Sequence, residues 1–187
     1  MGSEKGVGME DTIITGDEVF QRAFELVIEF EGYKTKDTGG RTVFGISENA
    51  HPEAVEKMWN IKKEEALEFA RGIYKREYWD LIYDVQWERY LDVDFEMLLI
   101  VEFDTAVNLG VERLLRWRDE LNQEENWIFI GWRIDLLLMK RLKFYARLAE
   151  YSKYRPYFRG WVNRLIKVRD YVEKLKEKEK VDKKEVI

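Results

Sequence analysis

The chain has 187 residues, of which 45% are hydrophobic, 37% charged and 14% aromatic, and its formal net charge at pH 7 is −5. This length and apolar content suffice for one domain with a buried core and exclude an intrinsically disordered chain. The acidic balance disfavours a nucleic-acid binder, and the absence of cysteine excludes disulfides and thiolate metal sites.

Composition divides the chain into three predicted parts. Residues 1–14 are mostly polar and are predicted to be disordered, residues 15–172 to form a single domain, and residues 173–187 to be a charged, solvated tail. No apolar run is long enough to span a membrane and no signal peptide is visible. We therefore expect that the protein does not insert into a membrane and that it stays in the cytoplasm until it is released from the cell interior. Abundant Lys, Glu and Arg with only three glutamines suggest a thermophile source.

The first predicted helix opens at Asp17 as N-cap and ends at Glu31, with Gly32 as its stop signal. At 100° per residue, Glu31 falls about 20° from Phe20, in the middle of an apolar face. The other members of that face are Ala23, Phe24, Val27 and Ile28. The helix is therefore predicted to direct one carboxylate inward at its last turn.

A glycine-rich stretch follows, in which Thr42, Val43 and Phe44 favour a small β-hairpin. Only two prolines and twelve glycines punctuate the chain, which favours long helices elsewhere. Helices are predicted over residues 52–59, 62–79, 95–109, 111–122 and 127–150, and from about Tyr157 onward. The predicted fold is mainly α, with six or seven helices and one β excursion after the first.

Glu31 is the leading catalytic candidate. Apolar neighbours and the negative end of the helix dipole both disfavour its anion, so it would hold the proton that a general acid needs. Glycosidic cleavage requires such an acid, and Asp37 or Thr42 could hold a water or stabilise the oxocarbenium-like transition state. An ordinary frayed helix end is the structural alternative for Glu31.

Four motifs carry a family resemblance. "EGYKTKDTGGRTVFGIS" (residues 31–47) resembles the signature of the N-acetylmuramidases of glycoside hydrolase family 108, in which E-G-G-[YF] precedes D-x-G-G-x-T-x-x-G-I-[ST]. It is also similar to the phage-type lysozymes. "IYKREYWD", "FDTAVNLG" and "FRGWVNRL" resemble the family's Y-x-x-x-Y-W, F-D-x-A-V-N-x-G and G-W-x-x-R segments. Tyr33 follows Gly32 directly, without the second glycine, and residues 126–140 lack the family's G-P-x-T type element.

The resemblance implies a lysozyme-like helical domain, like that of prophage endolysins, which hydrolyses the β-1,4 bond between N-acetylmuramic acid and N-acetylglucosamine. It implies that Glu31 is the essential acid and that Asp37 or Thr42 is the second group of the site. The expected partner is the peptidoglycan glycan strand, met by a monomer without metal or cofactor. A lytic transglycosylase, or a non-catalytic wall-binding or virion structural protein, remains as an alternative.

Polar candidates lie on two further segments. Asp104 and Asn108 share a helix face, where they could bind sugar hydroxyl or acetamido groups or form a buried polar pair. Arg164 could bind a muramyl carboxylate, although a pair with Asp170 or a helix C-terminus is the favoured interpretation. His51 precedes Pro52 and is predicted to begin a helix rather than to act in catalysis.

Aromatic candidates for stacking on sugar rings are Tyr33, Tyr78, Trp79 and Trp161. Most aromatic side chains in an α domain belong to its core, which is the alternative for each of them. Tyr33 is the preferred sugar-binding residue because it is close to Glu31 in the sequence.

Overall fold

The computed structural model describes residues 14–37, 40–123 and 130–185. The predicted disorder of residues 1–13 and the divergent residues 126–129 therefore lie outside the described part. The helices and strands in chain order are α1 (Gly16–Glu31), β1 (Lys34–Asp37), β2 (Gly40–Val43), β3 (Ile46–Ser47), α2 (Pro52–Trp59), α3 (Lys63–Tyr74), a π-helical turn (Lys75–Trp79), α4 (Asp80–Ile82), a 3₁₀ turn (Val85–Tyr90), α5 (Val93–Leu109), α6 (Val111–Gln123), α7 (Ile130–Ala149), a 3₁₀ turn (Arg155–Tyr157) and α8 (Phe158–Glu185). The prediction of a mainly α fold with a small β excursion is confirmed.

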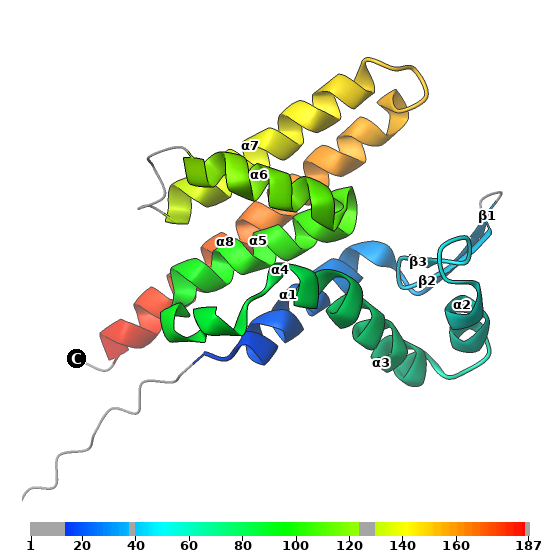
Figure 1. The fold of residues 1–187 in the computed structure, drawn as a ribbon, viewed down its shortest axis with the longest axis horizontal. Coiled ribbons are helices and arrows are strands. Elements are labelled where there is room, and N and C mark those ends of the chain that lie inside the picture. The colour runs from blue at the N-terminus through cyan, green and yellow to red at the C-terminus, as the bar shows by residue number, and fades with distance from the viewer. Residues whose placement is uncertain (1–13, 38–39, 124–129, 186–187) are drawn as a thin grey trace, which may run out of the picture.

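Helix α5 is the centre of the fold (Figure 1) and packs against α1, α6, α7 and α8. Eleven of its residues are buried on all sides, as expected for a helix whose sequence is apolar around its whole circumference. The sheet packs against α2 at one end of the molecule, away from the layer formed by α6, α7 and α8. Helix α1 joins the two parts, and its C-terminal end lies where they meet.

Three buried carboxylates on α5 each pair with an arginine from a different neighbouring helix. Glu96 accepts from Arg22 of α1, and Glu102 accepts from Arg118 of α6. Asp104 pairs with arginines of both α7 and α8. A buried carboxylate is strongly destabilising unless it is paired, so these pairs fix how the surrounding helices are placed around α5.

Helix α1 has its N-cap two residues earlier than predicted. Its N-cap is Thr15, whose hydroxyl oxygen accepts from the backbone N–H of Glu18, while the Glu18 carboxylate accepts from the backbone N–H of Thr15. This reciprocal capping box satisfies two N–H groups at the helix end and outcompetes Asp17, which lies exposed in the first turn. The prediction of Asp17 as N-cap was wrong.

The three strands form an antiparallel sheet in the order β1-β2-β3. Thr42 of the central strand lies opposite Thr35 of β1 and opposite Ser47 of β3. Phe44 and Gly45 connect β2 to β3 and both have positive φ, 48° and 79°. Two-residue hairpin turns of this handedness match the twist of the strands, and their positive φ values favour glycine.

Two segments predicted as simple helices differ in detail. Residues 62–79 leave α-helical geometry after Tyr74, because residues 75–79 form a π-helical turn, a form that recurs at functional sites. The last helix does not fray near residue 173 but continues to Glu185. Buried Val172 and partly buried Leu175 pack against the core, and Lys176 pairs with Asp94, which extends the docked part of α8 into the predicted tail.

Candidate active site

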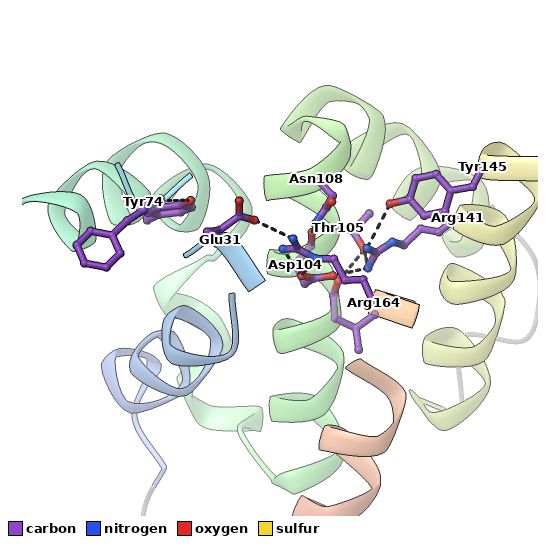
Figure 2. A network of polar contacts seen from close by, with 10 residues as sticks. Glu31, Tyr74, Asp104, Thr105, Asn108, Arg141, Tyr145 and Arg164 are labelled. Carbon is purple, nitrogen blue, oxygen red and sulfur yellow. Dashed lines mark hydrogen bonds and ion pairs between the residues drawn. The ribbon is translucent and has the colours of Figure 1, made fainter. Parts of the chain in front are cut away.

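Glu31 is the last residue of α1, and Gly32, with φ of 70°, ends the helix there. The Glu31 side chain is 23% exposed, and one carboxylate oxygen, Oε1, accepts a hydrogen bond from Nη1 of Arg164 at 2.7 Å. Figure 2 shows this carboxylate between Tyr74 on one side and Arg164 on the other. The structure thus places Glu31 in a partly buried position where the sheet end and the helical layer meet.

Arg164 connects Glu31 to a chain of buried charges (Figure 2). Its Nε donates to Oδ1 of Asp104 at 2.9 Å, and its Nη2 lies 2.7 Å from the same oxygen. The other oxygen of Asp104 accepts from Nη1 of Arg141 at 2.7 Å. Arg141 also donates to the hydroxyl groups of Thr105 and Tyr145. Asp104 and Arg141 are both fully buried, so solvent does not screen their interaction.

The β2–β3 turn closes against Glu31 from the other side. A methyl group at Gly45 would lie 2.8 Å from Oε2 of Glu31 and 2.6 Å from the hydroxyl oxygen of Tyr74. The Tyr74 hydroxyl donates to the backbone carbonyl of Phe44 at 2.9 Å, which holds the turn against α3. Glycine is therefore required at position 45 both by its backbone conformation and by the closeness of the Glu31 carboxylate.

A small pocket of about 150 Å³ lies beside this turn. Its polar lining includes Ser47, His51, Tyr74 and Tyr78, and Gly45 forms part of its wall. Nε2 of His51 lies 3.1 Å from the carboxylate of Glu77 in the π-helical turn. The pocket therefore has a mixed lining, in which hydroxyl and imidazole groups lie beside the apolar side chains of Ile46, Ala50 and Ile73.

Burial raises the pKa of two tyrosines near Glu31. For Tyr74, burial is the main cause and the negative charge of Glu31 adds to it. Burial is again the first cause for Tyr78, followed by the charges of Glu77 and Glu31. Both hydroxyl groups are protonated at neutral pH, as tyrosines ordinarily are, and the raised pKa values keep them protonated further into the alkaline range.

The surroundings of Glu31 differ from the predicted ones. Apolar neighbours were expected, but a guanidinium group donates directly to the carboxylate. The prediction that Arg164 pairs with Asp170 or a helix C-terminus was also wrong, because the Arg164 side chain reaches from α8 to Asp104 and Glu31. Helical periodicity places a residue on a face but does not identify which distant helix packs there.

Of the two polar candidates on α5, Asp104 is closed to a sugar ligand in this structure, whereas the sugar-binding role of Asn108 stays a prediction. Asp104 is completely buried and both of its oxygens are occupied by arginines, which corresponds to the structural alternative of a buried polar pair. Asn108 is partly buried, and its amide Nδ2 donates to the backbone carbonyl of Asp104 at 3.2 Å. It lies at the end of α5 nearest the polar network in Figure 2.

The strand candidates lie on the hairpin. Asp37 is the last residue of β1, in register with Gly40, and its side chain lies outside the described part. Thr42 is partly buried in the central strand. Their catalytic roles stay predictions.

The aromatic candidates divide between the core and the pocket. Trp79 is buried against Phe20 and Phe103, as its structural alternative predicted. Tyr78 lines the pocket beside Glu31. Tyr33 packs on Phe44 at 5.0 Å between ring centroids, and Trp161 stacks on Tyr145 at 4.9 Å. Tyr33 and Trp161 are each partly buried.

Sequence reasoning missed Arg141 and Tyr74 as members of the site. Arg141 lies among apolar residues of α7 and Tyr74 near the end of α3, inside two segments that were predicted only as helices. An arginine in the middle of an apolar helix face is itself a signal, because such a cation needs a buried carboxylate partner.

Within the described ranges, no three histidine, aspartate or glutamate side chains are grouped as a metal ion would need, and no helix has the length and apolar character of a membrane span. No curated protein and no solved structure matches the chain significantly. A family model described as Glycosyl hydrolase 108 matches residues 24–110, a segment that contains Glu31, the hairpin, the π-helical turn and α5. This match confirms the resemblance to glycoside hydrolase family 108 predicted from the motifs and supports a glycoside hydrolase that degrades peptidoglycan.

Proposed function

We propose that the protein is a muramidase that hydrolyses the β-1,4 bond between N-acetylmuramic acid and N-acetylglucosamine, with Glu31 as general acid. The observation that carries this proposal is the position of Glu31, a partly exposed carboxylate within the segment matched by the family model. It lies against Gly45, which also lines a small pocket. A general acid has to reach the glycosidic oxygen while its surroundings control its protonation.

The geometry around Glu31 supports this role over that of a frayed helix end. A frayed carboxylate would be solvated and free to move, whereas Glu31 is held by Arg164 and lies against Gly45. Fixed orientation of an acid is a requirement for efficient proton transfer. Asp37 or Thr42 is the proposed second group, which holds the attacking water or stabilises the developing cation.

Glu31→Gln tests the proposal. The variant removes the transferable proton but preserves the shape of the side chain and one acceptor oxygen for Arg164. We expect a loss of at least about 100-fold in the rate of reducing-end release from purified cell walls, in line with the size of general-acid effects. Glu29→Gln is the matched control, because Glu29 lies on the same helix turn and is exposed. It should retain full activity.

Normal wall digestion by Glu31→Gln would remove Glu31 from the mechanism. The mass of the products separates hydrolysis from the lytic transglycosylase alternative. A hydrolase adds one water to each cleaved bond, whereas a transglycosylase leaves a 1,6-anhydro end without added water. Wall binding without release of reducing ends would instead support a non-catalytic protein.

A further inference from the structure

Asp104 cannot take part in the reaction directly. It is fully buried, its Oδ2 is bound by Arg141 and its Oδ1 by Arg164. The Arg141 guanidinium is fully buried as well, and Nη1 also donates to the hydroxyl of Thr105, which itself donates to the carbonyl of Val101. Any influence of this pair on substrate must therefore act through Arg164.

Arg164 is shared between two carboxylates. Its Nε and Nη2 face Oδ1 of Asp104, while Nη1 donates to Oε1 of Glu31 at 2.7 Å. A guanidinium group is planar and presents its donors in a fixed fork, so fixing one edge against Asp104 also fixes the direction of Nη1. The four side chains Glu31, Asp104, Arg141 and Arg164 carry no net charge when Glu31 is ionised and one positive charge when Glu31 is protonated.

Other ionisable groups near Glu31 come from each element packed around it. Tyr74 on α3 and Tyr78 in the π-helical turn are neutral at neutral pH, as tyrosines ordinarily are, and burial raises the pKa of each further. Further charged groups on the described elements are the His51–Glu77 pair at the pocket and Lys167, whose ammonium lies 5.7 Å from the centre of the Phe30 ring. Arg164 is the cation that directly contacts the Glu31 carboxylate.

We propose that Asp104 and Arg141 are positioning residues that fix Arg164 and, through it, set how readily Glu31 takes up the proton it donates. This inference rests on the proposed role of Glu31 as general acid. Arg164 favours the Glu31 anion, and Asp104 opposes this effect because it competes for the same guanidinium and adds a negative charge. Asp104 thus limits how strongly Arg164 favours the Glu31 anion, and Arg141 holds Asp104 in place.

The proposal predicts opposite effects for two single substitutions. Arg164→Gln removes the cation, so Glu31 stays protonated to higher pH. The alkaline limb of the pH–rate profile therefore moves to higher pH. Asp104→Asn removes the negative charge that competes with Glu31 for Arg164. The alkaline limb therefore moves to lower pH. Each shift should be roughly one pH unit, the lower end of the effect of a charge at contact distance. Arg164→Lys keeps the charge and should return the limb toward its original position.

Glu102→Gln is the matched control. Glu102 is also buried on α5 and pairs with an arginine, Arg118, through two hydrogen bonds of 3.2 and 2.6 Å. Its substitution should lower stability as a lost buried ion pair does, without moving the pH–rate profile. A purely structural role for Asp104 would make the two α5 variants behave alike.

Two readouts keep the inference separate from the proposed function. The first is the pH–rate profile on purified walls, and the second is a carboxyl carbon titration of Glu31 in protein labelled with ¹³C-glutamate, assigned by its absence in Glu31→Gln. Shifts of opposite sign in both readouts support the proposal. Equal titration of Glu31 in wild type, Arg164→Gln and Asp104→Asn overturns it.

If Asp104→Asn does not fold, the comparison of Arg164→Gln with Arg164→Lys decides, because only the former loses the charge. Identical Glu31 titration in those two variants would overturn the proposal. If Glu31→Gln digests walls normally, the proposed function fails, while the titration still reports whether Arg164 and Asp104 act on Glu31.

Discussion

Gly45→Ala tests whether the β2–β3 turn positions Glu31. The added methyl group would lie 2.8 Å from Oε2 of Glu31, whereas ordinary van der Waals contact begins at 3.4 Å, so the carboxylate must move by about 0.6 Å. It would also lie 2.6 Å from the Tyr74 hydroxyl, whose hydrogen bond to the Phe44 carbonyl would be disturbed. Reacting groups misplaced by about 1 Å can lose on the order of 100-fold in rate.

Gly110→Ala supplies the matched control for this substitution. Gly110 has φ of 88°, close to the 79° of Gly45, but its added methyl group would meet no atom within 4 Å. Both variants carry the backbone penalty of alanine at positive φ, about 1–2 kcal/mol. For a domain of this size the penalty lowers Tm by roughly 2–8 °C. Only Gly45→Ala should lose further stability, about 1 kcal/mol in the free energy of unfolding, which is the value of one hydrogen bond.

The assay is release of reducing ends from purified walls well below the Tm of both variants, with folding verified by circular dichroism. Gly110→Ala should retain most of the wild-type rate, and Gly45→Ala should lose at least 10-fold, the lower part of the range expected for a displaced acid. Equal rates for the two variants would refute the argument, because they would mean that the contact between the turn and Glu31 has no part in the reaction.

Tyr74→Phe removes the donor to the Phe44 carbonyl and should lower the free energy of unfolding by about 1–2 kcal/mol, measured by urea denaturation; an unchanged midpoint would mean that water replaces the hydroxyl. Arg41 holds the pKa of Glu48 down at about 2 through side-chain and then backbone hydrogen bonds. Because that pKa is depressed in the folded state, the stabilisation is present above the unfolded value of 4.5 and is lost as pH falls toward 2. The Tm of Arg41→Gln should therefore fall less than that of the wild type between pH 5 and 2. Parallel curves of Tm against pH for the two proteins would contradict this linkage.

The sequence predicted the helices and strands better than it predicted which side chains contact one another. Periodicity located α1, α2 and α5, because each has an apolar pattern and a glycine or proline near one end. It missed the π-helical turn at residues 75–79, since one extra residue in a turn hardly changes the apolar spacing. It also chose Asp17 over Thr15 as N-cap, where the decisive feature was the reciprocal bond with Glu18.

The candidate site shows the same division. The inward direction of Glu31 followed from its place on the apolar face, and the structure brings it to a half-buried position. The cation beside it did not follow, because Arg164 reaches Glu31 from a helix far along the chain. Three-dimensional packing alone determines which of many arginines meets a given carboxylate.

The candidate site extends beyond the segment matched by the family model, because two of its arginines lie later in the chain. That segment ends at Gly110, yet Arg164 comes from the fourth motif, and Arg141 lies between the two. A chain that ended at Gly110 would leave the fully buried face of Asp104 without either cation, and an unpaired buried carboxylate is strongly destabilising. Helices α7 and α8 are therefore needed to make the charge on α5 tolerable, and the same arginine that satisfies it also contacts Glu31. The residues that stabilise the core and those that control the candidate acid belong to one network, so selection on either would maintain both.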